Sequence, residues 1–252
     1  TGEGARDAMK AKLLTGSAVF TMVLMLAAGM AVLGCDGTNP PTMGEGAASS
    51  MPADGQGGTE SYAEGEATEF EGVKLTPIKD QRNNALGGTR QLDKDTYRLV
   101  VDGLVTNPLS LSYADLQGYE QQSWLMDLDC VEGWSFTAKW TGPSLVDVLE
   151  DAQVDASGLI AIFYTDDVSA GYTSLELDYI LENDILLALK INDVTLPPER
   201  GFPFQVVAKS KYGYKWAKWV TRIEISADAD FRGFWESAGY SNDAEVGGPA
   251  FD

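Results

Sequence analysis

Leu128-Asp129-Cys130-Val131-Glu132-Gly133-Trp134-Ser135 ends one predicted strand and enters a glycine-containing turn. Apolar residues recur at every second position from 124 to 130, which predicts a strand whose apolar face ends at the thiol of Cys130. The other cysteine, Cys35, lies at the end of an apolar N-terminal run. A solitary Cys130 is either a small buried hydrophobe or a thiolate that binds a soft metal or acts as a nucleophile.

The overall composition limits the classes of function. The 252 residues are 44% hydrophobic and 10% aromatic, which is typical of a folded chain. The net charge is −20, from 38 acidic and 18 basic residues, and this argues against nucleic acid as a partner. These residues include no histidine, so they offer no histidine-ligated zinc or haem and no catalytic dyad that needs a histidine base.

The first 70 residues are expected to export and tether the chain. Two lysines precede an apolar run over 13–33, and Ala31-Val32-Leu33-Gly34-Cys35 resembles a bacterial lipobox, whose cysteine is lipidated. The run is also long enough to stay as an uncleaved membrane anchor. Residues 36–70 are rich in Gly, Pro, Ser, Thr and Glu, which predicts a flexible tether. We expect an export signal over 1–35, a tether over 36–70 and a folded domain over 71–252, outside the cytoplasm.

The folded part predicts many short strands and few helices. Apolar alternation or unbroken apolar runs predict strands over 97–101, 124–130, 159–164, 185–191, 203–208 and 217–225. Helices are predicted after Ser112, which forms a capping-box pattern with Asp115, from Pro143 onwards, and over 175–181. This mixture indicates an α+β domain with a mixed sheet. We expect the aromatic segment 231–240 to pack rather than to act.

A basic stretch stands out in this acidic chain. Residues 200–222 contain six of the 18 basic residues and no acidic residue. Tyr212-Gly213-Tyr214 in its middle reads as a tight loop, where Gly213 would let backbone N–H groups approach a ligand. The stretch therefore predicts a pocket for a phosphate or another small anion. The alternative is a solvated basic edge that offsets neighbouring acids.

Together these segments resemble the sulfite oxidase-type molybdopterin oxidoreductases. The resemblance rests on Cys130-Val131-Glu132-Gly133-Trp134-Ser135, on the two segments 200–207 and 211–219, and on residues 233–240, and it covers residues 76–242. It implies an α+β fold around a mixed β-sheet. It also implies a molybdenum-molybdopterin cofactor whose metal is bound by one cysteine thiolate, which would be Cys130.

The resemblance also implies roles for residues around the cofactor. Lys218, with backbone N–H groups near Trp216 and Ala217, would hold the pterin phosphate, and Lys211 and Lys215 would add positive field. The remaining cofactor residues that the resemblance suggests are Asn83, Thr165, Arg200 and Gln205. Gln205 stands where the family often has an arginine, and this departure argues against sulfite-like substrates. Arg200 is the nearby residue that could compensate.

The favoured hypothesis is a membrane-tethered, extracytoplasmic oxidoreductase that performs two-electron oxygen-atom transfer on a small-molecule substrate. We expect its electron partner to be a separate protein, because the sequence has no Cys-x-x-Cys-His haem-attachment motif. The alternative is a non-catalytic lipoprotein that keeps the fold as a binding or assembly module without molybdenum. Gln205 and an export signal without a twin arginine favour this alternative.

Overall fold

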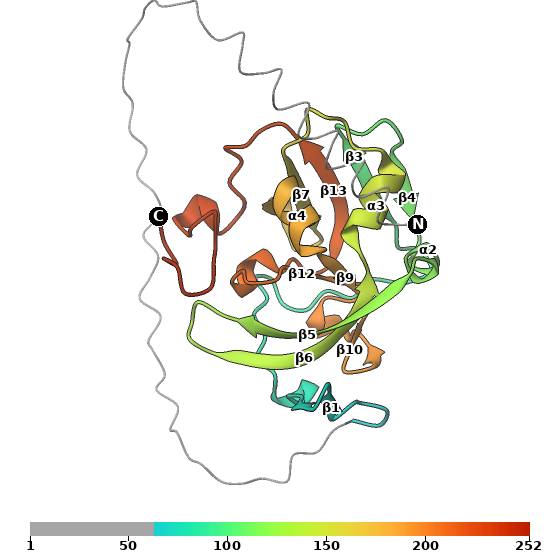
Figure 1. Ribbon diagram of the computed structural model, residues 1–252, viewed down its shortest axis with the longest axis vertical. Coiled ribbons are helices and arrows are strands. Elements are labelled where there is room, and N and C mark those ends of the chain that lie inside the picture. Colours follow the sequence, from blue (N-terminus) through green and yellow to red (C-terminus); the bar gives the residue numbers. More distant parts are fainter. Residues whose placement is uncertain (1–62) are drawn as a thin grey trace, which may run out of the picture.

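The computed structural model describes residues 63–252, so the predicted signal and most of the predicted tether lie outside the described residues. A five-stranded sheet organises this part of the chain (Figure 1), and its strand order is β4 (Leu109–Leu111), β3 (Leu99–Gly103), β13 (Val220–Ser226), β7 (Ile160–Thr165) and β8 (Val168–Glu176). β13 runs parallel to β3, whereas the other neighbours are antiparallel. The sheet is therefore mixed, as predicted.

A second sheet carries the central cysteine segment. It contains β11 (Val194–Thr195), β10 (Lys190–Ile191), β6 (Ser135–Pro143) and β5 (Gln121–Asp129), in that order. β5 and β6 form a long hairpin with Trp124 opposite Trp140, and Cys130 follows directly after β5. Two short pairs complete the strands: β12 (Gln205–Val207) with β9 (Leu186–Ala188), and β1 (Glu69–Phe70) with β2 (Val73–Lys74).

Few helices cover these sheets. Within residues 63–252, the α-helices are α2 (Tyr113–Gly118), α3 (Leu145–Ala152) and α4 (Leu177–Asn183). The 3-10 helices of this part are η1 (Ile78–Asp80), η2 (Pro198–Arg200), η3 (Gly213–Lys215) and η4 (Glu236–Ala238). α2 begins with the predicted capping box, in which the Ser112 hydroxyl accepts from the Asp115 N–H at 3.1 Å and the Asp115 carboxylate accepts from the Ser112 N–H at 2.8 Å. The α+β prediction is confirmed. None of the helices over 63–252 is long and apolar enough to cross a bilayer.

The structure corrects several predicted boundaries. The sequence-based prediction omits β6 and β8, and Pro143 is the last residue of β6 instead of the start of a helix. Ser144 caps α3, since its hydroxyl accepts from the Val146 N–H at 3.1 Å. Residues 185–191 form two strands rather than one, because the backbone of Leu189 bonds to Thr141 and Leu196 between them.

The folded part also begins earlier than residue 71. Glu66 is buried, and its carboxylate accepts from the N–H groups of Ala63 and Ile78 and from the Asn192 side chain. The Ala67 N–H donates to the Asn192 carbonyl at 2.8 Å. Residues 63–70 are therefore anchored to the folded domain, although the sequence placed them in the tether.

Candidate functional site

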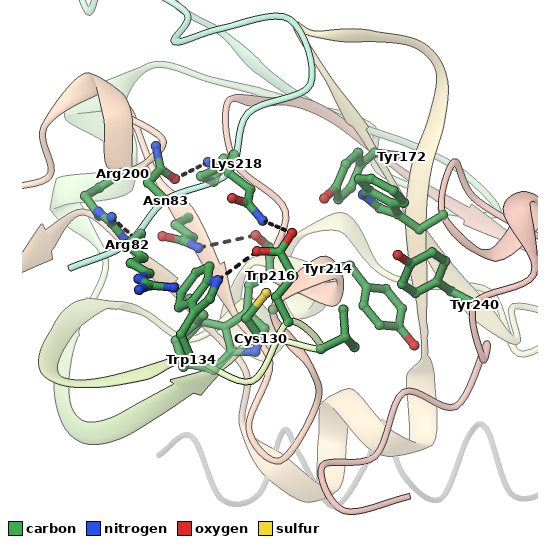
Figure 2. A pocket seen from close by; sticks show the side chains of 17 residues that line it. Arg82, Asn83, Cys130, Trp134, Tyr172, Arg200, Tyr214, Trp216, Lys218 and Tyr240 are labelled. Carbon is green, nitrogen blue, oxygen red and sulfur yellow. Dashed lines mark hydrogen bonds between the residues drawn. The ribbon is translucent and has the colours of Figure 1, made fainter. Parts of the chain in front are cut away.

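A pocket opens where the end of β5, the segment 82–84, the last residue of η2 and the loop between β12 and β13 meet, and together with its open mouth it measures about 650 Å³. A second hollow of about 950 Å³ continues from it and shares several of its lining residues, namely Asn83, Asn84, Glu132, Tyr172, Lys218 and Trp235. Figure 2 shows the Cys130 sulfur between two groups of side chains. On one side lie Arg82, Asn83, Trp134 and Arg200, and on the other lie Tyr172, Tyr214 and Tyr240.

Cys130 reaches the pocket from a tight turn. The Cys130 N–H donates to the Trp134 carbonyl at 2.9 Å, and the Gly133 N–H donates to the Cys130 carbonyl at 2.9 Å. Gly133 has φ of 83°, a left-handed conformation that glycine adopts without strain. Burial, and then the charge of Glu132, raise the pKa of the half-buried Cys130 thiol. The metal-free thiol therefore holds its proton at neutral pH.

Glu132 is held by hydrogen bonds at the edge of the same turn. Its carboxylate accepts from the Trp134 indole N–H at 2.9 Å and from the Asn84 amide at 3.2 Å. These bonds join the turn after β5 to the segment 82–84, which lies 48 residues earlier in the chain. The turn and the extended N-terminal segment therefore form one wall of the pocket.

Arg200 is a buried cation fixed by backbone carbonyls. Its side chain comes from the last residue of η2, and Nη2 donates to the carbonyls of Gln81 at 2.9 Å and Arg82 at 2.6 Å. The guanidinium carbon lies 5.0 Å from the centre of the Phe136 ring. Burial lowers the pKa of Arg200 to about 10, so the guanidinium stays charged at neutral pH. Its Nε has no hydrogen-bond partner among the described residues.

Lys218 lies close to the same charge. Its Nζ donates to the Asn83 side-chain oxygen at 2.6 Å and to the Asn84 carbonyl, and it lies 4.5 Å from the centre of the Trp219 ring. Burial, followed by the charge of Arg200, lowers the pKa of Lys218 to about 7, and Asp167 opposes this shift. Within residues 63–252, neither Lys218 nor Arg200 forms an ion pair. Two neighbouring unpaired cations form a site suited to an anionic group.

Gln205 and Trp216 form part of the floor. Gln205 is buried in β12, and its amide donates to the Trp216 carbonyl at 3.3 Å. Its Oε1 lacks a partner among the described residues. The Trp216 ring is buried and packs edge-on against Trp140, with ring centres 5.5 Å apart. The sequence-based assignment of Asn83, Cys130, Arg200, Gln205, Trp216 and Lys218 to one site thus corresponds to one pocket in the structure.

Lys211 and Lys215, the other two lysines expected at the cofactor, do not line this pocket. The Lys211 ammonium pairs with Asp243 at 2.8 Å and Glu245 at 3.0 Å. The Lys215 ammonium is buried and pairs with Glu236 at 2.6 Å. These carboxylates come from the C-terminal segment. They lie outside the stretch 200–222, so its lack of acidic residues gives no sign of these pairs in the sequence. The expectation that Lys211 and Lys215 add positive field to the pocket is therefore corrected, because each charge is already neutralised.

Three further expectations differ from the structure. Thr165 is buried at the end of β7 and lines a different groove, with Asp166 and Arg222. The Trp216 N–H donates to the Gly213 carbonyl at 3.1 Å, and the Ala217 N–H to the Lys215 carbonyl at 3.1 Å. Both groups are used within their own loop, and Ala217 does not line the pocket, so the predicted backbone cradle for a phosphate is not formed here. The positive charges that line the pocket instead belong to the side chains of Arg82, Arg200 and Lys218.

Sequence reasoning missed the aromatic side of the pocket. Tyr172 belongs to β8, a strand that was not predicted, and its pKa is raised by burial. Trp235 and Tyr240 come from the C-terminal segment that was expected only to pack, and their rings lie 5.2 Å apart, edge to face. The resemblance around Gly233 and Tyr240 was the one signal in the sequence that pointed to this segment.

A phosphate-bearing metal cofactor fits this set of groups. Three cations that form no ion pair within residues 63–252 line the pocket, namely Arg82, Arg200 and Lys218. Two buried polar atoms in it, Arg200 Nε and Gln205 Oε1, also lack partners among those residues. Buried polar atoms in proteins are normally hydrogen-bonded, so these two atoms are suited to a polar ligand. Cys130 adds the soft thiolate that molybdenum in a dithiolene cofactor requires. The described residues therefore fit molybdenum-molybdopterin.

This fold and this pocket define a molybdopterin-binding oxidoreductase domain. The chain belongs to the family described as "Oxidoreductase molybdopterin binding domain", whose model matches residues 86–235. The predictions of family, enzyme class and molybdenum-molybdopterin cofactor are confirmed by this match.

Known relatives agree with this membership. Uncharacterized oxidoreductase YuiH of Bacillus subtilis is 34% identical over 149 residues, which are 59% of this chain and 74% of YuiH. Protein-methionine-sulfoxide reductase catalytic subunit MsrP of Campylobacter jejuni is 25% identical over 180 residues, which cover 66% of this chain and 60% of MsrP. The crystal structure of the sulfane dehydrogenase SoxCD from Paracoccus pantotrophus matches with a TM-score of 0.58 and 25% identity. The match covers 61% of this chain and 44% of the SoxCD chain, so this chain spans less than half of that relative.

Proposed function

We propose that this protein is an extracytoplasmic molybdopterin-dependent oxidoreductase that performs two-electron oxygen-atom transfer on a small substrate. One observation supports the proposal most strongly: a single pocket contains the thiol of Cys130 and the unpaired cations Arg200 and Lys218. When bound, the molybdenum cofactor supplies the two-electron chemistry. Cys130 would hold the metal as its thiolate, with its proton released to the solvent, because metal binding would outweigh the effect of burial on the thiol pKa.

Arg200 and Lys218 bind and orient the anionic end of the cofactor. The carbonyls of Gln81 and Arg82 fix the Arg200 guanidinium before a ligand arrives, so little side-chain freedom is lost on binding. Lys218 is oriented by Asn83 and Asn84. An anion beside Lys218 raises its pKa and holds the proton on the ammonium. Gln205 Oε1, which has no partner among the described residues, would accept a hydrogen bond from the pterin.

The aromatic side of the pocket indicates an uncharged substrate, such as a sulfoxide. Tyr172, Tyr214 and Tyr240 line this side (Figure 2), and the Trp235 ring lies 5.2 Å from that of Tyr240. The three lining cations are Arg82, Arg200 and Lys218, and they lie with Asn83. An oxyanion such as sulfite would lose its hydration there without gaining a cationic partner. Reduction of a sulfoxide consumes two electrons and two protons and gives the sulfide and water. The similarity to MsrP, a protein-methionine-sulfoxide reductase, supports this choice.

The cofactor is tested by elemental analysis of protein purified from its native host. We expect about one molybdenum atom and one pterin per chain in the wild type, as one cysteine ligand implies. Cys130→Ser should fold and lose most of the bound molybdenum. A native protein that contains neither molybdenum nor pterin would overturn the proposal and support the non-catalytic binding module instead.

The substrate class is tested by turnover of the molybdenum-loaded protein. With a reduced viologen dye as electron donor, methionine sulfoxide and dimethyl sulfoxide should be reduced. With ferricyanide as electron acceptor, sulfite should give at most about a hundredth of that kcat/KM, because the aromatic side offers no cation. Efficient sulfite oxidation together with no sulfoxide reduction would contradict the choice of substrate, but not the cofactor assignment.

The location and the electron partner rest on the sequence. Residues 1–35 support export and attachment to a membrane, and the missing haem-attachment motif supports a separate electron-transfer protein. Fractionation of host cells should place the wild type with the membranes outside the cytoplasm. Cys35→Ser should abolish labelling by a fatty-acid analogue, whereas labelling that persists would contradict the lipoprotein assignment.

A further inference from the structure

The C-terminal segment, residues 231–252, is attached to the loop that contains η3. It lies beside this loop and beside β8, the edge strand of the five-stranded sheet, and is drawn in red in Figure 1. The Tyr212 N–H donates to the Ala244 carbonyl at 2.8 Å, and the Val246 N–H donates to the Ser210 carbonyl at 2.8 Å. The Tyr214 hydroxyl donates to the Ser241 carbonyl at 2.7 Å. The segment thus follows the loop along its length.

A buried ion pair joins the η3 loop to the C-terminal segment. The side chains of Lys215 and Glu236 are 1% and 0% exposed, and their charged atoms lie 2.6 Å apart. Lys215 Nζ also donates to the Ser174 carbonyl at 3.2 Å and to the Asn242 side chain at 3.0 Å. The Thr173 hydroxyl donates to Glu236, whose second oxygen has no partner among the described residues. Lys215 therefore connects β8, η4 and the chain after η4 through one ammonium group.

Gly233 permits this close approach. A Cβ atom at position 233 would lie 2.2 Å from the Tyr172 carbonyl oxygen and 2.7 Å from Glu236 Oε2. The Phe234 N–H donates to the same Tyr172 carbonyl at 2.8 Å. The segment is therefore pressed against β8 where any larger residue at position 233 would push it away.

The joined parts also form the aromatic side of the pocket. Gly213 and Tyr214 on the loop and Trp235 and Tyr240 on the segment all line it. The rings of Tyr214 and Tyr240 lie 5.3 Å apart, edge to face. Trp235 precedes Glu236 directly, so a shift of Glu236 moves a ring of the pocket wall.

We propose that Lys215 and Glu236 are positioning residues that hold the C-terminal segment as the substrate-facing wall of the pocket. The proposal rests on the proposed function, because it assigns substrate selection to this wall. The two residues act through Trp235 and Tyr240, and they contact neither the substrate nor the cofactor. A substrate held by this wall is bound less tightly when the segment moves, while the cofactor, held by Arg200, Lys218 and Cys130, stays in place.

The test combines kinetics with hydrogen exchange. In the molybdenum-loaded protein, Lys215→Met should raise the KM for methionine sulfoxide about tenfold, with kcat changed less than about threefold and molybdenum content unchanged. Amide exchange should accelerate over residues 231–247 and stay unchanged over 81–86. Gly233→Ala should give the same pattern without removing a charge. Lys139→Met is the matched control, since it breaks the Lys139–Asp193 pair, 2.6 Å apart, outside the pocket, and should give the wild-type KM and exchange pattern.

A second variant covers the case in which Lys215→Met does not fold because Glu236 is left buried and unpaired. Lys215→Met/Glu236→Leu leaves no unpaired charge, and it should fold while keeping the raised KM and the faster exchange. A wild-type KM and wild-type exchange in this double variant or in Gly233→Ala would overturn the proposal. Loss of molybdenum in parallel with activity would also overturn it, because the pair would then act on the cofactor. The exchange measurement needs no turnover, so it tests the attachment of the segment even if the proposed substrate is wrong.

Discussion

Lys218 carries an ammonium group into a place where its charge is unfavourable in the absence of a ligand. It lies near Arg200, and its bonds to Asn83 and Asn84 are to neutral oxygens. Burial and the charge of Arg200 lower its pKa from the ordinary 10.5 to about 7. A side chain that destabilises the free protein is typical of functional sites, where the cost is recovered when the ligand binds.

The pKa of Lys218 predicts how the stability of the cofactor-free protein depends on pH. Below about pH 7 the side chain is charged in both folded and unfolded states, so the folded protein bears the full cost. Between about pH 7 and 10.5 only the unfolded protein holds the proton, so stability rises with pH. The free energy of unfolding of Lys218→Met should therefore exceed that of the wild type by about 1 kcal/mol or more near pH 6, and this difference should shrink toward pH 10.

Thermal unfolding of the cofactor-free proteins across this range checks the prediction. Lys218→Arg is the control, because a guanidinium keeps its charge at every pH tested. That variant should lose stability relative to the wild type as the pH rises above about 7. A constant difference between wild type and Lys218→Met at all pH values would show that the lysine is not destabilised in the folded protein.

Among the secondary-structure elements, β6 places the cysteine hairpin against the rest of the domain. Gly142 lies near the end of β6, where the strand crosses β9. A Cβ atom there would lie 2.0 Å from the Leu187 carbonyl oxygen and 2.8 Å from Ala188 Cα. Both atoms belong to the backbone and cannot rotate away. This crossing holds β12, the partner of β9, and therefore Gln205 beside the end of β5.

Gly142→Ala is expected to destabilise the domain by about 3 kcal/mol or more, because a strand must shift to admit one methyl group. Gly118→Ala, at the end of α2, is the matched control, since a Cβ there meets nothing within 4 Å. It should change stability by less than about 1 kcal/mol. Urea unfolding of both variants measures their free energies of unfolding. Equal losses of stability in the two variants would contradict the close contact of Gly142 with β9.

The elements also show what sequence patterns can predict. β3, β7 and β13 were predicted within a few residues because their apolar runs are buried, whereas β8, with Thr173 and Ser174 in its interior, has no such run. Trp219 was taken as part of an inward-facing strand, but it has φ of 53° and precedes β13. The Trp219 ring is buried by tertiary contacts although its backbone is left-handed, and the alternation of apolar and polar residues does not predict such contacts.

Across the whole molecule, the site combines segments that are far apart in sequence. The thiol at 130 and the cations at 200 and 218 could be grouped from the sequence, because the resemblance orders them and their residue types suit the cofactor. In the sequence Lys211 and Lys215 are equivalent to Lys218. In the structure, however, Lys215 pairs with Glu236, 21 residues further on, and Lys211 pairs with Glu245, 34 residues further on. Only the folded arrangement separates lysines that bind a ligand from lysines that hold the chain together.

Cofactor loading should therefore stabilise the whole domain through Lys218 and not through Lys211. A ligand that binds only the folded state at about a thousand times its Kd adds ~4 kcal/mol, which for a domain of this size corresponds to a Tm rise on the order of 10 °C. We expect this rise when wild type from its native host is compared with protein from a host that lacks the pterin. Lys218→Met should lose most of the rise, because it removes one of the lining charges that bind the anion.

Lys211→Met separates this effect from a general loss of positive charge. It removes the same charge from the same stretch, yet its ammonium pairs with Asp243 and Glu245 and lies outside the pocket. The Tm of Lys211→Met should fall in both forms, while the Tm difference between loaded and cofactor-free protein should stay at the wild-type value. Equal losses of that difference in Lys211→Met and Lys218→Met would mean that the anion is bound by the field of the whole basic stretch. The division of its lysines into ligand-binding and segment-holding groups would then be wrong.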